Sequence, residues 1–198
     1  MQNLKLPHRV VLLDHADPQK EKLIPFERSQ NLVTFSVLTE AILMGKLKFN
    51  EEGLTIINDT PSPHSMINDL IQAVGRSHAN KSLYSWVEEL GVQIPFYKHV
   101  RENLVDNQVM HYHKKSILGL TYAASYSLKN PGIVTSYIQY LDEVTSHELD
   151  IRDLLCMIFL SNTQLSKVSF LSPRSDDIRK ELVLTDSQKM IVDTANKL

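Results

Sequence analysis

The stretch that decides the fold is LTEAILMGKLKFNEEGLTIINDTPSPHSMINDLI, residues Leu38–Ile71. Its first part predicts a helix that stops at Gly45, because glycine followed by lysine is typical of a helix C-terminus. Leu47 and Phe49 then alternate with polar Lys48 and Asn50, a Glu-Glu-Gly turn follows, and the return strand 54–57 is rich in β-branched residues, which together predict a β-hairpin. Ser62 is expected to cap a second helix, with Pro63 at its first position. The order predicted here is therefore helix, hairpin, helix.

The rest of the chain also predicts a mainly α fold, with one further hairpin. Residues Gln108–Tyr122 are expected to form that hairpin, with Lys114-Lys115 at its tip. The run Leu154–Leu160 is apolar almost all round, and we expect it to be the buried central helix of a single-domain helical bundle over residues 1–198. Apolar residues recur at helical spacing in six further segments, at about 28–44, 66–75, 83–91, 95–104, 132–144 and 186–197.

The composition of the 198-residue chain excludes several functional classes. Lys and Arg number 21 against 23 Asp and Glu, so bulk charge does not hold the chain on nucleic acid. The single cysteine, Cys156, allows no disulfide within the chain, and its apolar neighbours predict a buried, unreactive thiol. The longest strongly apolar run is about seven residues, too short to span a bilayer, and the N-terminal residues lack a signal-peptide pattern. We therefore expect a cytoplasmic protein, at most peripheral to a membrane.

No catalytic or cofactor-binding constellation is visible in the sequence. Asp14-His15 is similar to part of a hydrolase dyad, but no G-x-S-x-G motif accompanies it. The phosphate-binding patterns G-x-x-x-x-G-K-[ST] and G-x-G-x-x-G do not occur. His111 and His113 share one face of a predicted strand, yet no cysteine or carboxylate at matching spacing completes a metal site. Trp86 is expected in the core. The sequence thus predicts no enzyme activity, no cofactor and no metal.

The order of the helix and hairpin signals resembles the Golgi phosphoprotein three family, whose bacterial members have the same core domain. In that family a helix of pattern L-x-E-L-x-L-x-G-x-[ILV] precedes a short hairpin, and D-x-x-P-T-G-D-x-x-L-D-x-x-L follows. Leu38–Leu47 and Asp59–Asp69 are the corresponding segments here.

Further segments match that family in order and at similar spacing. Ser82–Val87 resembles S-V-x-x-W-V, Asn103–Met110 resembles N-L-V-E-K-G-V-L, and Asp150–Leu155 resembles the helix start D-P-R-x-x-A-L. Ile117–Leu120 is similar to the return strand of the family hairpin. The resemblance spans roughly His8–Leu165, and its specificity comes from the order of the motifs, since each motif alone is weak.

The resemblance implies a non-enzymatic adaptor-like protein that binds lipid at a membrane surface. Eukaryotic family members bind phosphatidylinositol 4-phosphate through a tryptophan and three arginines, and an ungapped alignment places these positions at Pro25, Thr34, Ile94 and Tyr97. Loss of three guanidiniums removes the planar donors that suit phosphate. Arg28, Lys98 and Arg101 lie nearby in the sequence, and we expect them to bind a phosphoinositide or another anionic lipid headgroup instead.

The predicted second hairpin is a candidate for self-association, as the family hairpin can be. Its return strand is apolar on both faces, whereas a strand with one exposed face normally alternates. A second copy of the chain is one cover for the extra apolar face, and the rest of the same monomer is the other. The candidate self-association residues are His111, Tyr112, Ile117, Leu118, Leu120 and Tyr122.

The alternative function is a winged-helix-like nucleic-acid-binding protein. A helix followed at once by a two-stranded wing is predicted twice, and Lys98, His99 and Arg101 on the second helix would be the groove contacts. Glu102 and Asp106 on the same helix argue against nucleic acid, because they would repel phosphates. A DNA-binding assay beside a liposome flotation assay separates the two functions.

Overall fold

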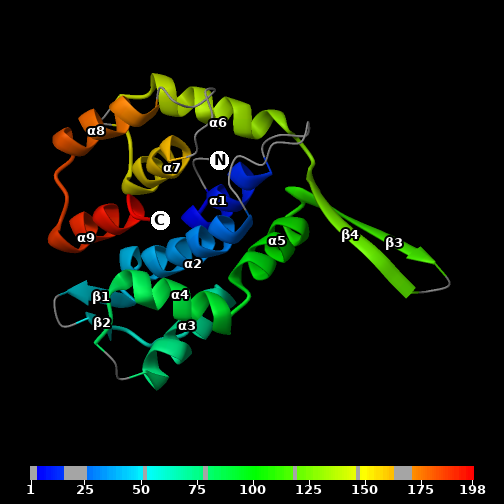
Figure 1. The fold of residues 1–198 in the computed structure, drawn as a ribbon, viewed down its shortest axis with the longest axis horizontal. Helices are drawn as coiled ribbons and strands as arrows, with labels where there is room; N and C mark the ends of the chain where they lie inside the picture. Colours follow the sequence, from blue (N-terminus) through cyan, green and yellow to red (C-terminus); the bar gives the residue numbers. More distant parts are fainter. Residues whose placement is uncertain are drawn as a thin grey trace.

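The computed structural model describes residues 4–15, 26–50, 53–77, 80–117, 120–145, 148–162 and 171–198. Within these ranges lie nine helices and two antiparallel two-stranded sheets, which confirms the mainly α fold with two hairpins (Figure 1). In chain order the elements are α1 (Leu6–Asp14), α2 (Phe26–Leu43), β1 (Leu47–Asn50), β2 (Gly53–Ile56), α3 (Ser65–Arg76), α4 (Leu83–Gln93), α5 (Phe96–Asp106), β3 (Met110–Ile117), β4 (Leu120–Leu128), α6 (Gly132–Glu143), α7 (Ile151–Ser161), α8 (Leu171–Glu181) and α9 (Asp186–Ala195).

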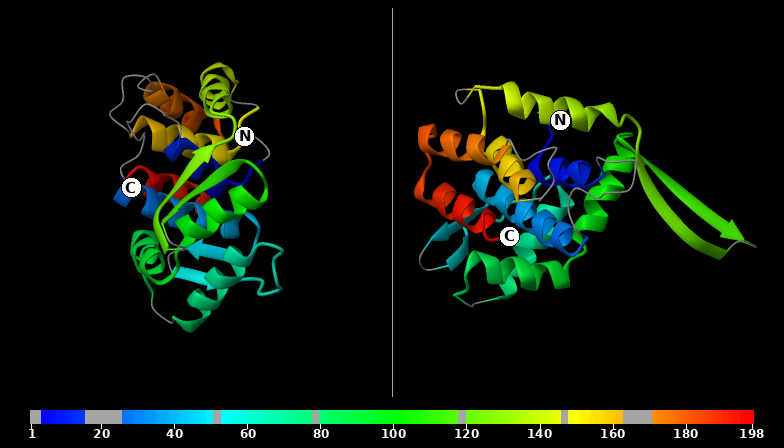
Figure 2. Two further views of the ribbon diagram at one scale, coloured as in Figure 1. Left: turned by 90° about the vertical axis from the view of Figure 1, so that its right-hand side faces the viewer. Right: turned by 45° about the horizontal axis from the view of Figure 1, so that its top comes forward.

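Three helices, α1, α2 and α7, form the interior. Leu154–Leu160 of α7 are all buried, as their apolar run predicted. All residues of α1 are also buried, and α2 is buried continuously over residues 32–41. Helix α1 packs against both α2 and α7. Helices α6 and α8 lie on one side of this interior, and α3 and α4 lie on the other (Figures 1 and 2).

Two of the sequence motifs that carry the family resemblance meet in this interior. Glu40 of α2 is 2% exposed and accepts two hydrogen bonds from Arg152 of α7, from Nη2 at 2.8 Å and from Nε at 3.0 Å. The same carboxylate accepts the N–H of Leu6 at 3.3 Å, a donor with no partner inside α1. Burial opposes the charge of Glu40, but the hydrogen bonds from Arg152 outweigh it and lower the pKa of Glu40. This ion pair ties α1 and α7 to α2.

A second buried polar cluster joins α1, α6 and α7. Arg9 Nη1 donates to Asp153 Oδ1 at 2.5 Å, and the Tyr137 hydroxyl donates to the same oxygen at 2.6 Å. Asp153 also completes a capping box with Asp150 at the start of α7. Burial raises the pKa of Asp153, and the hydrogen bond from Tyr137 and the charge of Arg9 oppose this shift. Because each polar group depends on its partners here, the cluster fixes how the three helices meet.

The end of α2 confirms the role predicted for Gly45. Its φ is +67°, in the left-handed region where glycine is favoured. The N–H of Gly45 donates to Ile42 O at 2.9 Å and that of Lys46 to Ala41 O at 2.9 Å, the two bonds of a Schellman motif. Strand β1 follows immediately and pairs with β2 in the register Leu47↔Ile56.

The prediction that Ser62 caps the next helix was wrong. Helix α3 begins at Ser65, with His64 at its N-cap. Ser62 Oγ instead accepts the N–H of His64 at 3.2 Å, and the Asn68 side chain bonds both the N–H and the carbonyl of Ser62, at 2.7 and 2.9 Å. Ser62 therefore closes the turn that precedes α3.

The helical segments predicted at 66–75 and 83–91 both end at a glycine in the sequence, but the helices continue past these glycines. Helix α3 continues one residue beyond Gly75, and α4 continues to Gln93, two residues beyond Gly91. A Cβ atom at Gly91 would lie 3.2 Å from Thr34 Oγ1, tighter than ordinary contact. Gly91 thus allows α4 to approach α2 closely, which is a packing role.

Candidate functional site

The β3–β4 hairpin projects away from the helical body (Figure 1). Its register runs from Met110↔Leu128 outward to Ile117↔Leu120, with an irregularity between Lys115 and Ser116. The hairpin is thus longer than predicted. Lys114 and Lys115 were expected at the tip, but they lie within β3, opposite Ala124 and Ala123.

The charge of this hairpin has one sign. Residues 108–130 contain no Asp or Glu, while they contain Lys114, Lys115, Lys129, His111 and His113. Among the described side chains, those of residues 111–116 are all exposed. Of the predicted self-association residues, the structure describes the side chains of His111 and Tyr112, which lie near the base of the hairpin. It does not describe Leu118 or the side chains of Ile117, Leu120 and Tyr122.

A tight turn joins α5 to the hairpin. The N–H of Gln108 donates to Val105 O at 2.9 Å and that of Val109 to Leu104 O at 2.8 Å, so α5 ends in a Schellman motif. Gln108 occupies its left-handed position with φ 59°, where the family motif N-L-V-E-K-G-V-L has glycine. Met110 is 1% exposed and anchors the base of β3 in the core.

Two of the three cations predicted to bind lipid lie on α5. Lys98 is exposed, and its Nζ lies 3.8 Å from the Glu102 carboxylate. The guanidinium carbon of Arg101 lies 4.6 Å from the centroid of the Tyr97 ring and 4.3 Å from that of Tyr126 on β4. Lys98 is thus accessible from solvent, whereas Arg101 lies at the joint between helix and hairpin.

The third cation, Arg28, is engaged elsewhere. Its Nη1 donates at 3.0 Å to the carbonyl of Asn162, the C-cap of α7. A guanidinium at a helix C-terminus satisfies an orphan carbonyl and interacts favourably with the helix dipole. Burial lowers the pKa of Arg28.

The positions aligned with the family's lipid-binding arginines carry no cation and are mostly buried. Thr34 is 2% exposed, and its hydroxyl donates to Gln30 O at 3.0 Å. Tyr97 is 6% exposed, and its hydroxyl donates to the Asp14 carboxylate; burial, followed by the negative charge of Asp14, raises the pKa of Tyr97. Ile94 is partly buried, and Pro25 lies outside the described residues.

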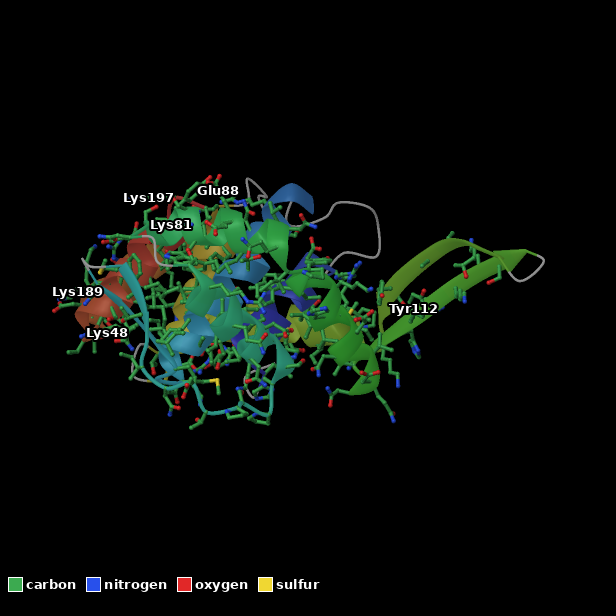
Figure 3. The ribbon with its side chains drawn as sticks, turned by 90° about the horizontal axis from the view of Figure 1, so that it is seen from below. Lys48, Lys81, Glu88, Tyr112, Lys189 and Lys197 are labelled. Atoms are coloured by element: carbon green, nitrogen blue, oxygen red, sulfur yellow. The ribbon has the colours of Figure 1, made fainter. Side chains whose placement is uncertain are left out.

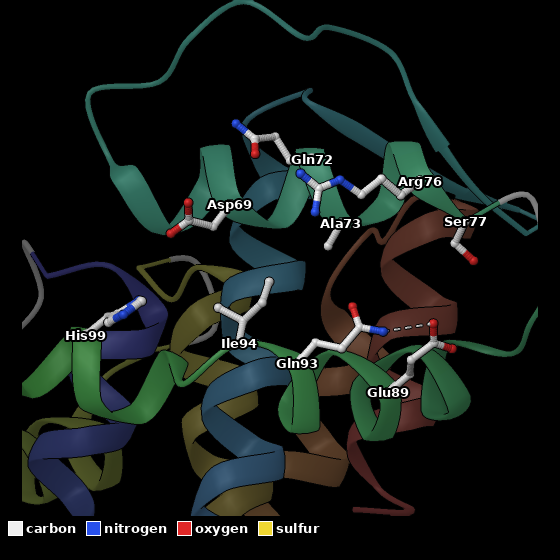
Figure 4. Close-up of a pocket in the computed structure, with 9 residues that line it drawn as sticks. All are labelled: Asp69, Gln72, Ala73, Arg76, Ser77, Glu89, Gln93, Ile94 and His99. Carbon is white, nitrogen blue, oxygen red and sulfur yellow. Dashed lines mark hydrogen bonds between the residues drawn. The ribbon is translucent and has the colours of Figure 1, made fainter.

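Ile94 lines a cavity of about 510 Å³ between α3, α4 and the start of α5 (Figure 4). One guanidinium, that of Arg76, and two carboxylates, those of Asp69 and Glu89, line this cavity. Glu89 also pairs with Lys81 and accepts a hydrogen bond from Gln93 Nε2 at 3.3 Å. Two carboxylates against one guanidinium do not favour an anionic ligand. The lining residues are Asp69, Gln72, Ala73, Arg76, Ser77, Glu89, Gln93, Ile94 and His99.

The residues similar to a hydrolase dyad have structural partners. Asp14 accepts the Ser29 hydroxyl at 2.9 Å and the Tyr97 hydroxyl, and it is 4% exposed. His15 Nδ1 donates to the carbonyl of Val11 at 2.9 Å. Asp14 therefore joins α1, α2 and α5, and nothing in this arrangement activates a nucleophile.

The two hairpin histidines lie side by side without further metal ligands. Their ring centroids are 5.8 Å apart, and His113 Nε2 lies 2.8 Å from Ser127 Oγ. Within the described part of the chain, no group of three or more His, Cys, Asp or Glu side chains is placed to hold a metal ion. Cys156 is fully buried, and burial raises the pKa of its thiol to about 12, although the nearby Arg9 acts in the opposite direction.

Comparison with known proteins identifies the family. The family model of Golgi phosphoprotein 3 (GPP34) matches residues 6–193, almost the whole chain. The chain belongs to the Golgi phosphoprotein 3 family. A search of curated proteins found no match to the chain. The Golgi phosphoprotein 3 match confirms the resemblance drawn from the motifs around Gly45, Trp86 and Asp150.

Two surfaces of this Golgi phosphoprotein 3 family member carry exposed lysines. One is the projecting hairpin with the neighbouring Lys98. The other lies at the opposite end of the body, where Figure 3 shows the exposed Lys48, Lys189 and Lys197 far from Tyr112 of the hairpin. No helix among the described residues is both long enough and apolar enough to cross a bilayer.

The winged-helix alternative gains no support from this arrangement. A recognition helix presents its cations to a groove, but Arg101 is covered by Tyr126 from the hairpin that follows α5. Lys98 is beside Glu102 on the same helix. The sequence placed Arg101 on the correct helix, but both tyrosine contacts were missed. Tyr97 lies four residues before Arg101 on the same helix, a spacing that is visible in the sequence, whereas Tyr126 reaches Arg101 only through the hairpin register.

Proposed function

We propose that this Golgi phosphoprotein 3 family member is a non-enzymatic, adaptor-like protein that attaches peripherally to anionic membrane surfaces. The ligand is the headgroup of a phosphoinositide or another anionic lipid. The observation that carries the proposal is the projecting hairpin, whose residues 108–130 contain three lysines and no carboxylate side chain. Such a segment is attracted to negative membrane charge.

The cations near the hairpin set the strength of this interaction. Lys98 on α5 is close to its base, and Lys114, Lys115 and Lys129 belong to the hairpin itself; all four are exposed, whereas Arg101 is covered by Tyr126. Each Lys or Arg near an anionic surface contributes about 1 kcal/mol, so the four lysines contribute about 4 kcal/mol. This corresponds to a Kd of about 1 mM, and several copies acting together would strengthen attachment. Arg28 contributes less, because its guanidinium is hydrogen-bonded at the end of α7.

Flotation with vesicles tests the proposal. Neutral vesicles, vesicles with phosphatidylserine and vesicles with phosphatidylinositol 4-phosphate are compared at low and moderate salt. We expect binding to both anionic kinds, stronger at low salt because salt screens surface charge. Equal binding to the last two would make charge the only requirement, and preference for the phosphoinositide would indicate headgroup recognition. Absence of binding to every vesicle at low salt would refute the function.

We propose self-association through the same hairpin as a second property. Among the described residues, β3 and β4 pair only with each other, so each strand has an unpaired outer edge. Tyr112 is 46% exposed on this projecting element. Deletion of residues 111–116 should lower the mass measured by sedimentation equilibrium. A monomeric mass before and after the deletion would contradict self-association.

A further inference from the structure

Arg101 is held between two tyrosine rings from different elements. Tyr97 lies one turn earlier on α5, at 4.6 Å, and Tyr126 belongs to β4, at 4.3 Å. The Nε atom of Arg101 is buried and makes no hydrogen bond among the described residues. Both rings are within cation–π distance of the guanidinium. A lysine at this position would offer a compact ammonium instead, which does not stack on two rings as a guanidinium can.

Both tyrosines are themselves anchored. The Tyr97 hydroxyl donates to Asp14, which also accepts the Ser29 hydroxyl at 2.9 Å, so this ring is fixed to α1 and α2. The Tyr126 ring lies 5.0 Å from Tyr112 directly across the hairpin. A continuous series of contacts thus runs from the interior of the body to the base of the hairpin, with Arg101 at its centre.

We propose that Arg101 is a positioning residue that clamps the hairpin to α5 and so sets the direction in which it projects. Tyr126 lies two residues from the base pair Met110↔Leu128, whereas Lys114 and Lys115 lie beyond it along the hairpin. A small rotation at the base moves the outer lysines furthest, because strands rise roughly 3.3 Å per residue. Arg101 therefore acts on the presentation of the lysines, in addition to any charge of its own.

The consequence for membrane binding rests on the proposed function, but the clamp itself does not. Arg101→Lys keeps the positive charge and removes the planar stack. Tyr126→Leu removes the stack from the other side without changing charge, and Tyr126→Phe keeps the ring. If Arg101 acts as a clamp, the first two substitutions have the same effect and the third has none. If Arg101 acts only by charge, Arg101→Lys resembles the wild type.

Spin-label distances measure the clamp directly. Labels are placed by cysteine substitution at Ala123 on β4 and Glu88 on α4, both exposed, while the buried Cys156 stays unlabelled. We expect Arg101→Lys and Tyr126→Leu to broaden the distance distribution, and Tyr126→Phe and the matched exchange Arg76→Lys to leave it unchanged. A second label pair within the body, at Glu88 and Asp142, keeps its distance if the body stays folded. An unchanged Ala123–Glu88 distribution in Arg101→Lys would overturn the clamp.

Flotation with phosphatidylserine vesicles then tests the effect on lipid contact. We expect several-fold weaker binding for Arg101→Lys and Tyr126→Leu, and wild-type binding for Tyr126→Phe and Arg76→Lys. Wild-type binding by Arg101→Lys, together with a broadened distribution, would overturn the link between clamp and membrane. If the unsubstituted protein bound no vesicle, the proposed function would fail, whereas the distance distributions would still decide the clamp.

Discussion

Replacement of Gln108 by glycine should stabilise this protein. Gln108 is exposed and has φ 59°, in the left-handed region, at the Schellman turn between α5 and β3. This conformation costs an L-residue roughly 1–2 kcal/mol, and the greater entropy that glycine loses on folding offsets about 0.5–1 kcal/mol. The net expectation is a gain of about 0.5–1 kcal/mol in the free energy of unfolding. The side chain is exposed, so its removal costs little else.

The measurement is thermal and urea unfolding of Gln108→Gly beside the wild type. For a chain of this length, 1 kcal/mol shifts Tm by about 2–4 °C, so Tm should rise by about 1–4 °C. Asn107→Gly is the matched control, because Asn107 has φ −81° and its side chain donates to Asn103 O at 2.8 Å. The control should be destabilised. Any loss of stability in Gln108→Gly would show that the left-handed conformation of Gln108 is not a source of strain.

Three further predictions concern the interior. Glu40→Gln should lower the free energy of unfolding, measured by urea denaturation, by about 2–4 kcal/mol. The loss is smaller than for a fully buried ion pair because the Arg152 side chain is 26% exposed, and a loss below about 1 kcal/mol would contradict the role of the Glu40–Arg152 pair. Burial lowers the pKa of His8, so the folded state takes up its proton less readily than the unfolded state, and stability should fall as pH drops below about 6.5. His8→Gln should reduce this loss between about pH 7.5 and pH 5.5, and an unchanged pH dependence would count against it. Cys156 should react with a thiol reagent only under unfolding conditions, because it is fully buried with a raised pKa; rapid labelling of the native protein would be inconsistent with this.

Most of the helices were predictable because their apolar residues follow the helical period. The continuous apolar run Leu154–Leu160 predicted a buried helix, and apolar residues at helical spacing predicted the amphipathic helices. Helices α1 and α8 were missed. All residues of α1 are buried, so it shows no amphipathic stripe, and α8 has only Leu171 and Ile178 as buried apolar residues among its described side chains. The end of α2 was predicted because Gly45 is a local signal. The start of α3 was not, because the hydrogen bonds of Asn68 around Ser62 compete with capping.

The candidate site was less predictable, because it depends on contacts between distant residues. The two charged side chains Lys114 and Lys115 suggested a turn, but the register is fixed at the base, where Met110 is buried opposite Leu128. That register also brings Tyr126 to Arg101. The sequence spacing predicted that Lys98 and Arg101 share one helix, but it did not show that Lys98 is exposed to solvent while Arg101 is covered by Tyr126.

The most direct test of the central claim compares two lysine pairs in flotation with phosphatidylserine vesicles. Lys114→Gln with Lys115→Gln removes two charges from the hairpin. Lys48→Gln with Lys189→Gln removes the same charge from exposed positions at the opposite end of the body (Figure 3). We expect roughly 30-fold weaker binding for the hairpin pair, from about 1 kcal/mol per lysine, and wild-type binding for the other pair. Equal weakening by both pairs, or weakening by the opposite-end pair alone, would contradict it.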